Sequence, residues 1–272
     1  MFGLYITIIL MAVLLVAAVI MLVPGSGCNE MRETFKNAKL AHRGLHTKDK
    51  SIPENSMAAF RRAVEAGYGI ELDIQLAASG EVVIFHDITT DRVCGVSNTI
   101  ERMSFDEISE LRLCGSDEKV PLFKDFLEMV DGRVPLLIEL KPTNNYSNLC
   151  KAAWEFMKDY KGQFCIESFD PRILGWFKKN HPEIMRGQLT GPCDTLGGDG
   201  VTFIVRFMIS SLLSNVVARP HFVSYRKYCF GITYRLVRFL GAMTFVWTVR
   251  DDDNADELAR TNDAIIFEFI KP

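Results

Sequence analysis

Apolar and polar residues follow three different patterns along the chain. Residues 4–23, LYITIILMAVLLVAAVIMLV, contain no charged side chain. The residues after them begin with PGSG and then mix acidic and basic side chains, as a short linker does. From there to the end of the chain, short apolar runs alternate with helical patterns. We therefore expect an apolar helix at 1–24, a linker at 25–38 and one folded domain at 39–272.

The short apolar runs of the domain are typical of strands that are buried on both faces. They occur at 39–42, 69–76, 82–86, 135–140, 164–169, 184–190, 221–225, 244–249 and 264–270. Helical patterns lie between most of them, such as SMAAFRRAVEAG, with Ser56 as its expected N-cap and Gly67 at its C-terminal end. Repeated βα units call for a parallel sheet, and about eight of them close a (β/α)8 TIM barrel.

One connection departs from this pattern. Only residues 77–81 separate the second run from the third, and a parallel connection needs about a dozen residues or more. The two runs therefore form either a hairpin or one bent strand, and we expect the barrel to be irregular at this point. There are nine candidate strands for the eight strand positions of the barrel, and the sequence does not show which of them lies outside the barrel.

The apolar N-terminal segment is long enough to cross a membrane. At about 1.5 Å of rise per residue, its twenty positions span about 30 Å, the thickness of the hydrocarbon core of a bilayer. We expect a single-pass anchor; a cleaved signal sequence and a lipid-modified Cys28 are the alternatives. Arg32, Lys36 and Lys39 follow the segment and no basic side chain precedes it, which favours a domain on the cytoplasmic side of the membrane.

Length, charge and cysteine content narrow the function classes. A chain of 272 residues is within the range of a single α/β barrel. The formal net charge of −3 argues against a nucleic-acid partner, since such proteins carry a basic surface. The seven cysteines are odd in number and form no CxxC pair, which is typical of scattered thiols and not of a disulfide framework or a zinc site. No pattern in the sequence indicates an oligomeric state.

Acidic side chains occur inside two of the predicted strands. In GIELDIQL, Glu71 and Asp73 are separated by one residue, so both carboxylates point to the same face of the strand. LLIELK repeats this alternation with Glu139 and Lys141. A cluster of carboxylates at strand ends suits Mg²⁺ or Ca²⁺, which prefer oxygen ligands. The alternative for each acid is a structural ion pair with a basic residue.

Two histidines end predicted strands. His42 closes the first run and His86 the third, and a barrel would bring both to its C-terminal rim. Two such histidines can share proton transfer, one taking a proton from the nucleophile and the other giving one to the leaving oxygen. Arg43 adds a permanently charged, planar donor suited to a phosphate oxygen. Together with a metal, these groups fit phosphoryl transfer.

The polar motifs, taken together, resemble a known family. They are HRG at 42–44, PENSMAAF at 53–60, ELDIQL at 71–76, FHD at 85–87, IELK at 138–141, SF at 168–169 and WTV at 247–249. In this order, and with Arg92 and Gly95 after the second histidine, they look like the glycerophosphodiester phosphodiesterase family. The resemblance covers nearly all of residues 39–270. It implies an irregular TIM barrel that hydrolyses glycerophosphodiesters to glycerol 3-phosphate and an alcohol with a divalent metal.

The resemblance also implies roles for individual residues. The metal ligands would be Glu71, Asp73 and Glu139, with Glu54 as a further candidate. His42 and His86 would be the acid/base pair, Arg43 and Lys141 would contact the phosphate, and Asn55 would support the site. Trp247 would line the substrate pocket, and a buried structural role is the alternative for it. In the mechanism proposed for such enzymes, the glycerol 2-hydroxyl attacks phosphorus and a cyclic phosphate is then hydrolysed. Ala77 and Ser79 depart from the family pattern in a turn, and His46 has no role in it.

Two segments bear on the choice of substrate. Residues 88–118 are expected to form a variable cap over the site. The apolar stretch 201–218 contains Arg206 and several serines, which argues against a second membrane span, so it is either a buried helix of the barrel or a helix at the membrane interface. An interfacial helix would favour lysophospholipids over water-soluble glycerophosphodiesters, which makes a lysophospholipase D the alternative enzyme. A catalytically silent, membrane-tethered binding protein is a third alternative, which the loss of His42, His86 or a metal carboxylate would indicate.

Overall fold

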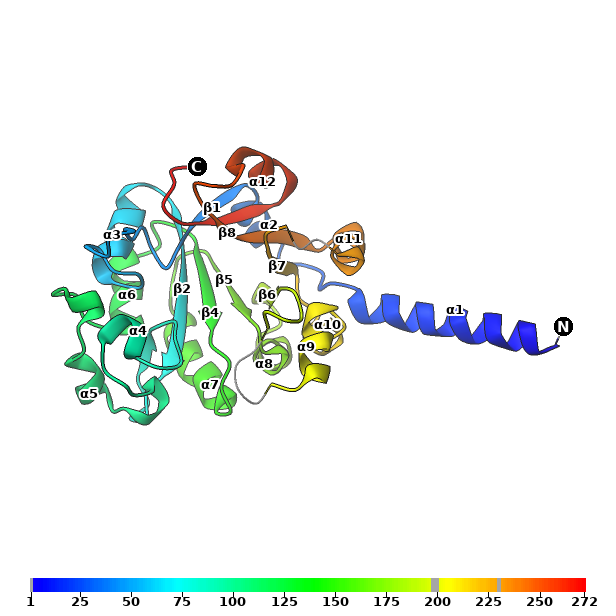
Figure 1. The fold of residues 1–272 in the computed structure, drawn as a ribbon, viewed down its shortest axis with the longest axis horizontal. Helices are drawn as coiled ribbons and strands as arrows, with labels where there is room; N and C mark the ends of the chain where they lie inside the picture. Colours follow the sequence, from blue (N-terminus) through cyan, green and yellow to red (C-terminus); the bar gives the residue numbers. More distant parts are fainter. Residues whose placement is uncertain (1, 197–200, 229–230) are drawn as a thin grey trace.

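The strands of the domain close into a barrel (Figure 1). The computed structural model describes residues 2–196, 201–228 and 231–272. The eight parallel strands are β1 (Ala38–His42), β2 (Gly69–Leu76), β4 (Leu136–Leu140), β5 (Phe164–Ser168), β6 (Arg186–Thr190), β7 (Phe222–Arg226), β8 (Met243–Val249) and β9 (Ala264–Phe267). Each pairs with the next in this order, and β9 pairs with β1 to close the barrel. The predicted TIM barrel is confirmed.

The strand that lies outside the barrel is β3 (Val82–Ile84). It runs antiparallel to β2 and pairs with the last residues of that strand, 74–76. β1 pairs with the first residues of β2, 69–71, so β3 extends the ladder beyond the barrel wall. The second and third apolar runs therefore form a hairpin, which is the irregularity that the short connection predicted.

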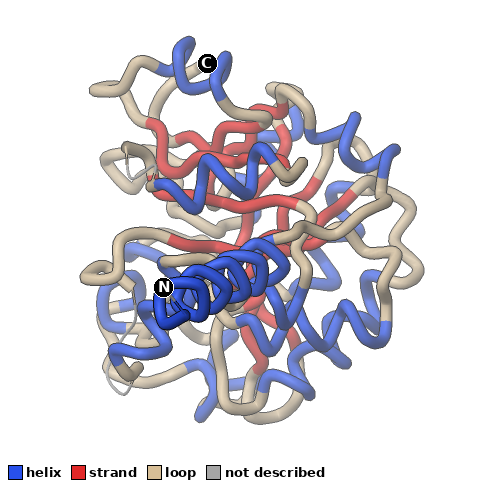
Figure 2. Tube along the Cα trace, turned by 90° about the vertical axis from the view of Figure 1, so that its right-hand side faces the viewer, coloured by secondary structure: helices blue, strands red, loops and turns tan. Residues whose placement is uncertain are grey.

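Helices cover the outside of the barrel (Figure 2). Those between successive strands include α3 (Met57–Glu65), α6 (Phe123–Val130), α7 (Tyr146–Met157), α8 (Pro171–Asn180), α10 (Asn215–Ala218), α11 (Ile232–Phe239) and α12 (Ala255–Thr261). Ser56 caps α3 as expected, because its hydroxyl accepts a hydrogen bond from the backbone N–H of Ala59 at 3.1 Å. Outward-facing strand residues and these helices form the main apolar core, in which Phe60 of α3 packs edge-on against Phe126 of α6.

The barrel interior is apolar at the N-terminal end of its strands. Phe222 and Phe245 stack there with ring centroids 4.2 Å apart, and Phe35 of α2 (Asn29–Phe35) stacks on Phe245. α2 lies within the segment expected as a linker. Gly187 leaves the space that Phe222 fills, because a Cβ at this position would lie 1.9 Å from the phenylalanine ring. This packing closes one end of the barrel, so a site can open only at the other end.

The segment 88–118 forms a small subdomain beside the barrel. It contains α4 (Asp91–Cys94), α5 (Phe105–Ser109) and two turns of 3₁₀ helix, Ile100–Arg102 and Leu113–Gly115. A core of its own holds it together, in which Ile100 and Ile108 are completely buried. The segment is therefore a packed unit next to the C-terminal end of β3.

The N-terminal segment forms α1 (Phe2–Leu22), the one helix among the described residues that is long and apolar enough to cross a membrane. It projects from the domain, and only Leu22 is buried (Figure 1). By length and composition it is an anchor or a signal sequence. The second apolar stretch is divided into α9 (Phe203–Ser210) and α10, too short for another span. α9 buries only Ile209, so it is not a buried barrel helix.

Candidate active site

Inward-facing carboxylates of three neighbouring strands meet at the open end of the barrel. Asp73 of β2 is in register with Glu139 of β4, and Glu139 is in register with Glu167 of β5. Glu71 lies one inward position earlier on β2. Glu71, Asp73 and Glu139 are buried, and each offers a carboxylate oxygen within 4.8 Å of the other two. Strand alternation therefore gathers the acids that the spacing predicted.

This cluster holds more negative charge than its neighbours neutralise. Lys141 Nζ lies 2.9 Å from Glu139 Oε1 and 3.2 Å from Asp73 Oδ1. Although burial opposes it, the charge of Lys141 holds the pKa of Asp73 well below its usual range. Burial and then the charge of Asp73 raise the pKa of Glu71 well above its usual range, and burial with the charge of Glu139 does the same for Glu167. A cation among these oxygens would remove the repulsion and let all of them ionise.

The donor atoms around the cluster fit a hard divalent cation. All three carboxylates offer oxygen, which suits Mg²⁺ or Ca²⁺. Asn55 donates from Nδ2 to Asp73 Oδ2 at 2.9 Å, and its buried Oδ1 has no hydrogen-bond partner among the described residues. Glu167 Oε2 is also buried and also has no hydrogen-bond partner among the described residues. Unpartnered buried oxygens beside three acids are what a cation site requires.

His42, at the end of β1, is oriented by a carboxylate from the other end of the chain. Its Nδ1 lies 2.5 Å from Glu268 Oε1, and its Nε2 lies 3.8 Å from Glu71 Oε2. Burial and then the neighbouring guanidinium of Arg43 lower the pKa of His42 to about 4, against the opposing effect of Glu268. The imidazole is therefore neutral near pH 7, with Nε2 directed to the carboxylate side of the site.

His86 follows β3 and belongs to a network that joins the barrel to the subdomain of residues 88–118, the segment expected from the sequence to form a cap. Its Nδ1 lies 2.6 Å from Asp87 Oδ1. Arg92, on α4 of the cap, binds Asp87 at 2.5 Å and Glu54 at 2.6 Å. Despite the opposing effect of burial, hydrogen bonds from Arg92 and the charge of Arg43 lower the pKa of Glu54 to about 2. Glu54 thus lies between two arginines, outside the three-carboxylate cluster.

Arg43 contacts both the carboxylate cluster and Glu54. Its backbone N–H donates to Glu71 Oε2 at 2.9 Å, and its guanidinium lies 2.6 Å from Glu54 Oε1 and 3.6 Å from Asp73 Oδ2. The turn that allows this has φ of +79° at Gly44, where a Cβ would lie 2.9 Å from the backbone of Ala59. Glycine is therefore required after Arg43, because α3 packs directly on the turn.

A cavity of about 360 Å³ opens above these groups. Its polar wall is formed by His42, Arg43, His46, Glu54, Glu71, His86, Arg92, Glu139, Glu167, Arg250 and Glu268, and its apolar wall by Phe169, Leu189, Trp247, Ile266 and Phe269. Trp247 donates from Nε1 to the carbonyl of Ser224 at 3.2 Å and packs edge-on against Phe169. It thus lines the cavity while its ring nitrogen is anchored. Lys141 lies behind the wall, against the carboxylates.

The sequence as a whole matches one family model over most of its length. The Glycerophosphoryl diester phosphodiesterase family model matches residues 42–271. The chain belongs to this family. By family it is a phosphoric diester hydrolase.

Alignments with individual relatives of this phosphodiesterase cover less of the chain than the family model does. A glycerophosphodiester phosphodiesterase of Caldanaerobacter subterraneus subsp. tengcongensis is 32% identical over 170 residues, 57% of this chain and 67% of the relative. A lysophospholipase D of Homo sapiens is 31% identical over 142 residues, 47% of this chain and 43% of the relative. The chain therefore spans about two thirds or less of the length of these relatives. The structure of an Oleispira antarctica phosphodiesterase in complex with the product sn-glycerol-3-phosphate has the same fold, with a TM-score of 0.67, 21% identity and coverage of 87% of this chain and 94% of the other.

Two carboxylates of this phosphodiesterase site were not singled out by the sequence patterns. Glu167 is a lone acid within the apolar run FCIESF, and Glu268 is a lone acid within AIIFEFI. Each alternates with an apolar residue of the barrel interior, Cys165 and Ile266, and that alternation was the available signal. His46, which had no expected role, lies with its Nε2 3.7 Å from Glu268 Oε1. It contributes to the surroundings of the carboxylate that orients His42.

Proposed function

We propose that this enzyme hydrolyses glycerophosphodiesters to glycerol 3-phosphate and an alcohol. The observation that carries the proposal is that His42 and His86 line one cavity together with Glu71 and Glu139 of the carboxylate cluster. The Caldanaerobacter relative is a glycerophosphodiester phosphodiesterase, and the similar Oleispira enzyme is described with glycerol 3-phosphate as its product. Both support the same reaction for this chain.

The two histidines would divide the proton transfers. One takes the proton of the glycerol 2-hydroxyl as its oxygen attacks phosphorus, and the other gives a proton to the alcohol oxygen as the P–O bond to the alcohol breaks. Water then opens the cyclic phosphate with the roles reversed, which breaks the bond between phosphorus and the 2-oxygen. Glu268 holds the Nδ1 side of His42, so Nε2 remains for the substrate.

The carboxylates would hold the metal, and the bases would hold the phosphate. Glu71, Asp73 and Glu139 are the proposed ligands of Mg²⁺ or Ca²⁺, supported by Asn55, which fixes Asp73. When bound, such a cation polarises the phosphate and offsets its developing charge. Arg43 reaches the cavity from the turn and is the proposed phosphate contact. Lys141 is proposed to keep two of the carboxylates in place between turnovers, in addition to any contact with phosphate.

Lysophospholipids are the second candidate substrates. The specific observation in their favour is the apolar wall of the cavity, where Phe169, Trp247 and Phe269 offer a surface that a small polar head group does not need. The similarity to a lysophospholipase D agrees with it. Release of glycerol 3-phosphate from glycerophosphocholine, compared with release of choline from lysophosphatidylcholine, distinguishes the two substrates.

We propose that α1 is retained as a single-pass anchor and that the catalytic domain faces the cytoplasm. The basic residues Arg32, Lys36 and Lys39, which follow α1 in the sequence after the PGSG stretch, support this orientation. Protease accessibility in sealed membrane vesicles tests it. Cleavage of the domain only from the cytoplasmic face is expected, and a chain that has lost α1 would contradict the anchor.

The reaction is tested with the full-length enzyme, Mg²⁺ or Ca²⁺ and glycerophosphocholine. His42→Asn and His86→Asn are each expected to lower turnover by about 10²-fold or more, as removal of an acid/base group does, without unfolding the domain. His181→Asn is the matched control, because His181 stacks on Trp154 outside the cavity. Normal turnover in either site variant would reject the proposed roles.

A further inference from the structure

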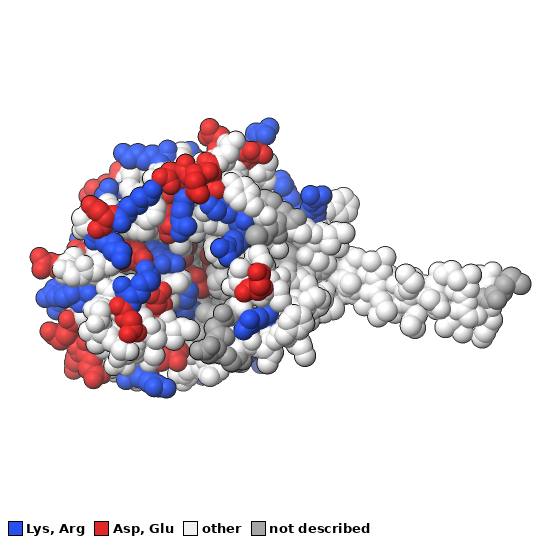
Figure 3. Space-filling view, viewed as in Figure 1, with Lys and Arg blue, Asp and Glu red and all other residues white. Residues whose placement is uncertain are grey.

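Exposed apolar side chains lie on α10 and α11, which contact the base of α1, and on α9, which precedes α10 in the chain. They come from three helices and form what we call the apolar collar: Phe203, Ile204, Phe207, Val216, Val217, Ile232 and Phe239, each 38% to 86% exposed. α1 contacts α10 and α11 at this place, where Leu22 packs with Leu212 and Val237. In Figure 3, charged side chains crowd the rounded part of the domain, while the surface next to α1 is largely free of them. The collar is therefore continuous with the apolar helix.

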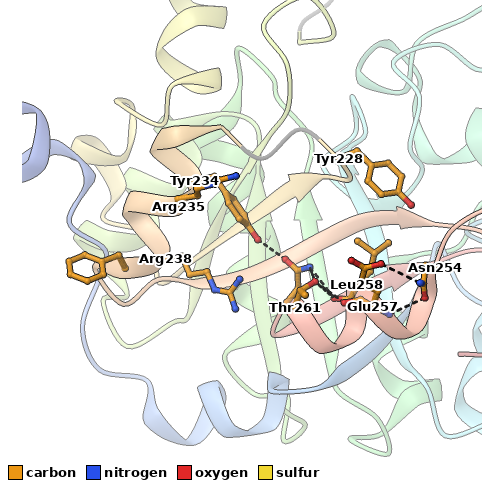
Figure 4. A pocket seen from close by; sticks show the side chains of 10 residues that line it. Tyr228, Tyr234, Arg235, Arg238, Asn254, Glu257, Leu258 and Thr261 are labelled. Carbon is orange, nitrogen blue, oxygen red and sulfur yellow. Dashed lines mark hydrogen bonds between the residues drawn. The ribbon is translucent and has the colours of Figure 1, made fainter.

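The charged residues of the chain segment that carries the collar have one sign, whereas α12 on the far side of the groove described below carries the acidic Asp256 and Glu257. Residues 200–250 contain seven Lys or Arg and no Asp or Glu, although the whole chain has a net charge of −3. Arg235 and Arg238 are exposed on α11, between the collar residues Ile232 and Phe239. They line one wall of a groove of about 780 Å³ between α11 and α12, over which Arg238 extends (Figure 4). Apolar side chains bordered by basic ones are typical of helices that lie on anionic membranes.

The exposed, free part of α1 is short enough that a membrane crossed by it would reach the collar. Residues 2–17 are exposed, whereas Ala18, Val19, Met21 and Leu22 are already partly or fully covered by the domain. Arg219 holds this end, since its guanidinium donates to the carbonyls of Ile20 and Val23. At about 1.5 Å per residue, the free part spans about 24 Å, about 6 Å less than the hydrocarbon core.

We propose that the apolar collar docks into an anionic lipid surface, with α9 and α11 lying among the head groups. Interfacial helices bury their apolar face by about 5 to 10 Å, which matches the distance that α1 leaves uncovered. Both helices follow strands whose C-terminal ends form the site rim, β6 and β7, so docking would place one side of that rim at the bilayer. The proposal rests on the retention of α1 as an anchor.

The test uses the full-length chain in vesicles of phosphatidylcholine and phosphatidylglycerol. A polarity-sensitive fluorescent amino acid replaces Ile204 or Ile232, and spin-labelled phosphatidylcholine serves as the quencher. Ile88 is the matched control, because it is a comparably exposed isoleucine on the cap, and Leu10 reports the insertion of α1. We expect the quencher to lower the emission at Ile204, Ile232 and Leu10, since these positions would lie in the bilayer or at its interface, and to leave the emission at Ile88 unchanged.

The other outcomes separate the proposals. Quenching at Leu10 alone overturns docking and leaves the anchor intact, whereas quenching nowhere overturns the anchor as well. Emission that is shifted to the blue but not quenched at Ile204 and Ile232 identifies a second copy of the chain as the occupant and also overturns docking.

The anionic part of the proposal has its own controls. Arg235→Gln with Arg238→Gln is expected to lower the ratio of docked to undocked collar about 30-fold, at about 1 kcal/mol for each arginine near a charged surface. Arg61→Gln with Arg102→Gln, at exposed positions away from the collar, should leave the ratio unchanged. Equal quenching in pure phosphatidylcholine would contradict a requirement for anionic lipid.

Discussion

Glu268 is expected to affect the turnover number kcat through His42, whose ring its carboxylate orients, and not through contact with the reacting phosphate. Its Oε1 lies 2.5 Å from His42 Nδ1, and its Oε2 accepts from Arg250 Nε at 2.8 Å. Glu268→Gln keeps the size of the side chain and removes its charge. The ring of His42 then loses a charge-assisted hydrogen bond that fixes which nitrogen faces the cavity.

The size of the effect follows from the strength of that bond. Hydrogen bonds to charged groups contribute about 1.5 to 3 kcal/mol, which corresponds to about a 10- to 160-fold decrease in kcat. KM should change little, because the phosphate contacts of Arg43 are unaltered. A structural role alone would lower the melting temperature and leave kcat per folded molecule constant, so both are measured.

A double-mutant cycle tests whether Glu268 acts through His42. Glu268→Gln should have almost no further effect on turnover in a His42→Asn background, because the carboxylate acts through that imidazole. Glu128→Gln, at an exposed position on α6, is the matched control. Effects of Glu268→Gln and His42→Asn that multiply independently, or a normal kcat in Glu268→Gln, would refute the reasoning.

Three further predictions concern stability and the metal. His221 is buried, and burial with the charges of Arg186 and Arg32 lowers its pKa to about 4. Since the unfolded chain binds a proton near pH 6.5, the free energy of unfolding should fall by about 3 kcal/mol as pH drops from 6.5 to 4, and His221→Gln should remove this part of the pH dependence in thermal unfolding. Gly187→Ala should destabilise the barrel by about 1 to 3 kcal/mol or more by crowding Phe222, whereas Gly95→Ala, where no atom lies within 4 Å of a new Cβ, should cost only the strain of its positive φ; equal melting temperatures for Gly187→Ala and the native enzyme would contradict the packing. Saturating Mg²⁺ or Ca²⁺ should raise the melting temperature of the native enzyme and not that of Glu71→Gln with Glu139→Gln, and an equal shift in both would place the cation elsewhere.

The strands could be predicted from sequence because the barrel buries both of their faces. Runs such as PLLIEL are apolar except for one acid, and such acids point into the barrel, which is why Glu71, Asp73 and Glu139 could be grouped. The strand outside the barrel could not be chosen, because Val82–Ile84 is as apolar as the strands of the wall. Its exclusion depends on the antiparallel register with the end of β2.

The partners of the histidines were less predictable for a different reason. Glu268 lies 226 residues from His42 in sequence, and only closure between β9 and β1 brings the two together. The stretch 201–218 shows the limit of hydrophobicity as a signal, because apolar residues such as Phe203 and Ile204 are exposed on α9 while Leu212 is buried. Apolar composition alone does not distinguish a core from a surface that meets lipid.

The most direct test of the account is release of glycerol 3-phosphate from glycerophosphocholine by the full-length enzyme before and after chelation. The account predicts that chelation abolishes the release and that Mg²⁺ or Ca²⁺, added back alone, restores it, because Glu71, Asp73 and Glu139 offer only oxygen to a cation. An enzyme that stays fully active after chelation would contradict the metal site, and with it the proposed mechanism.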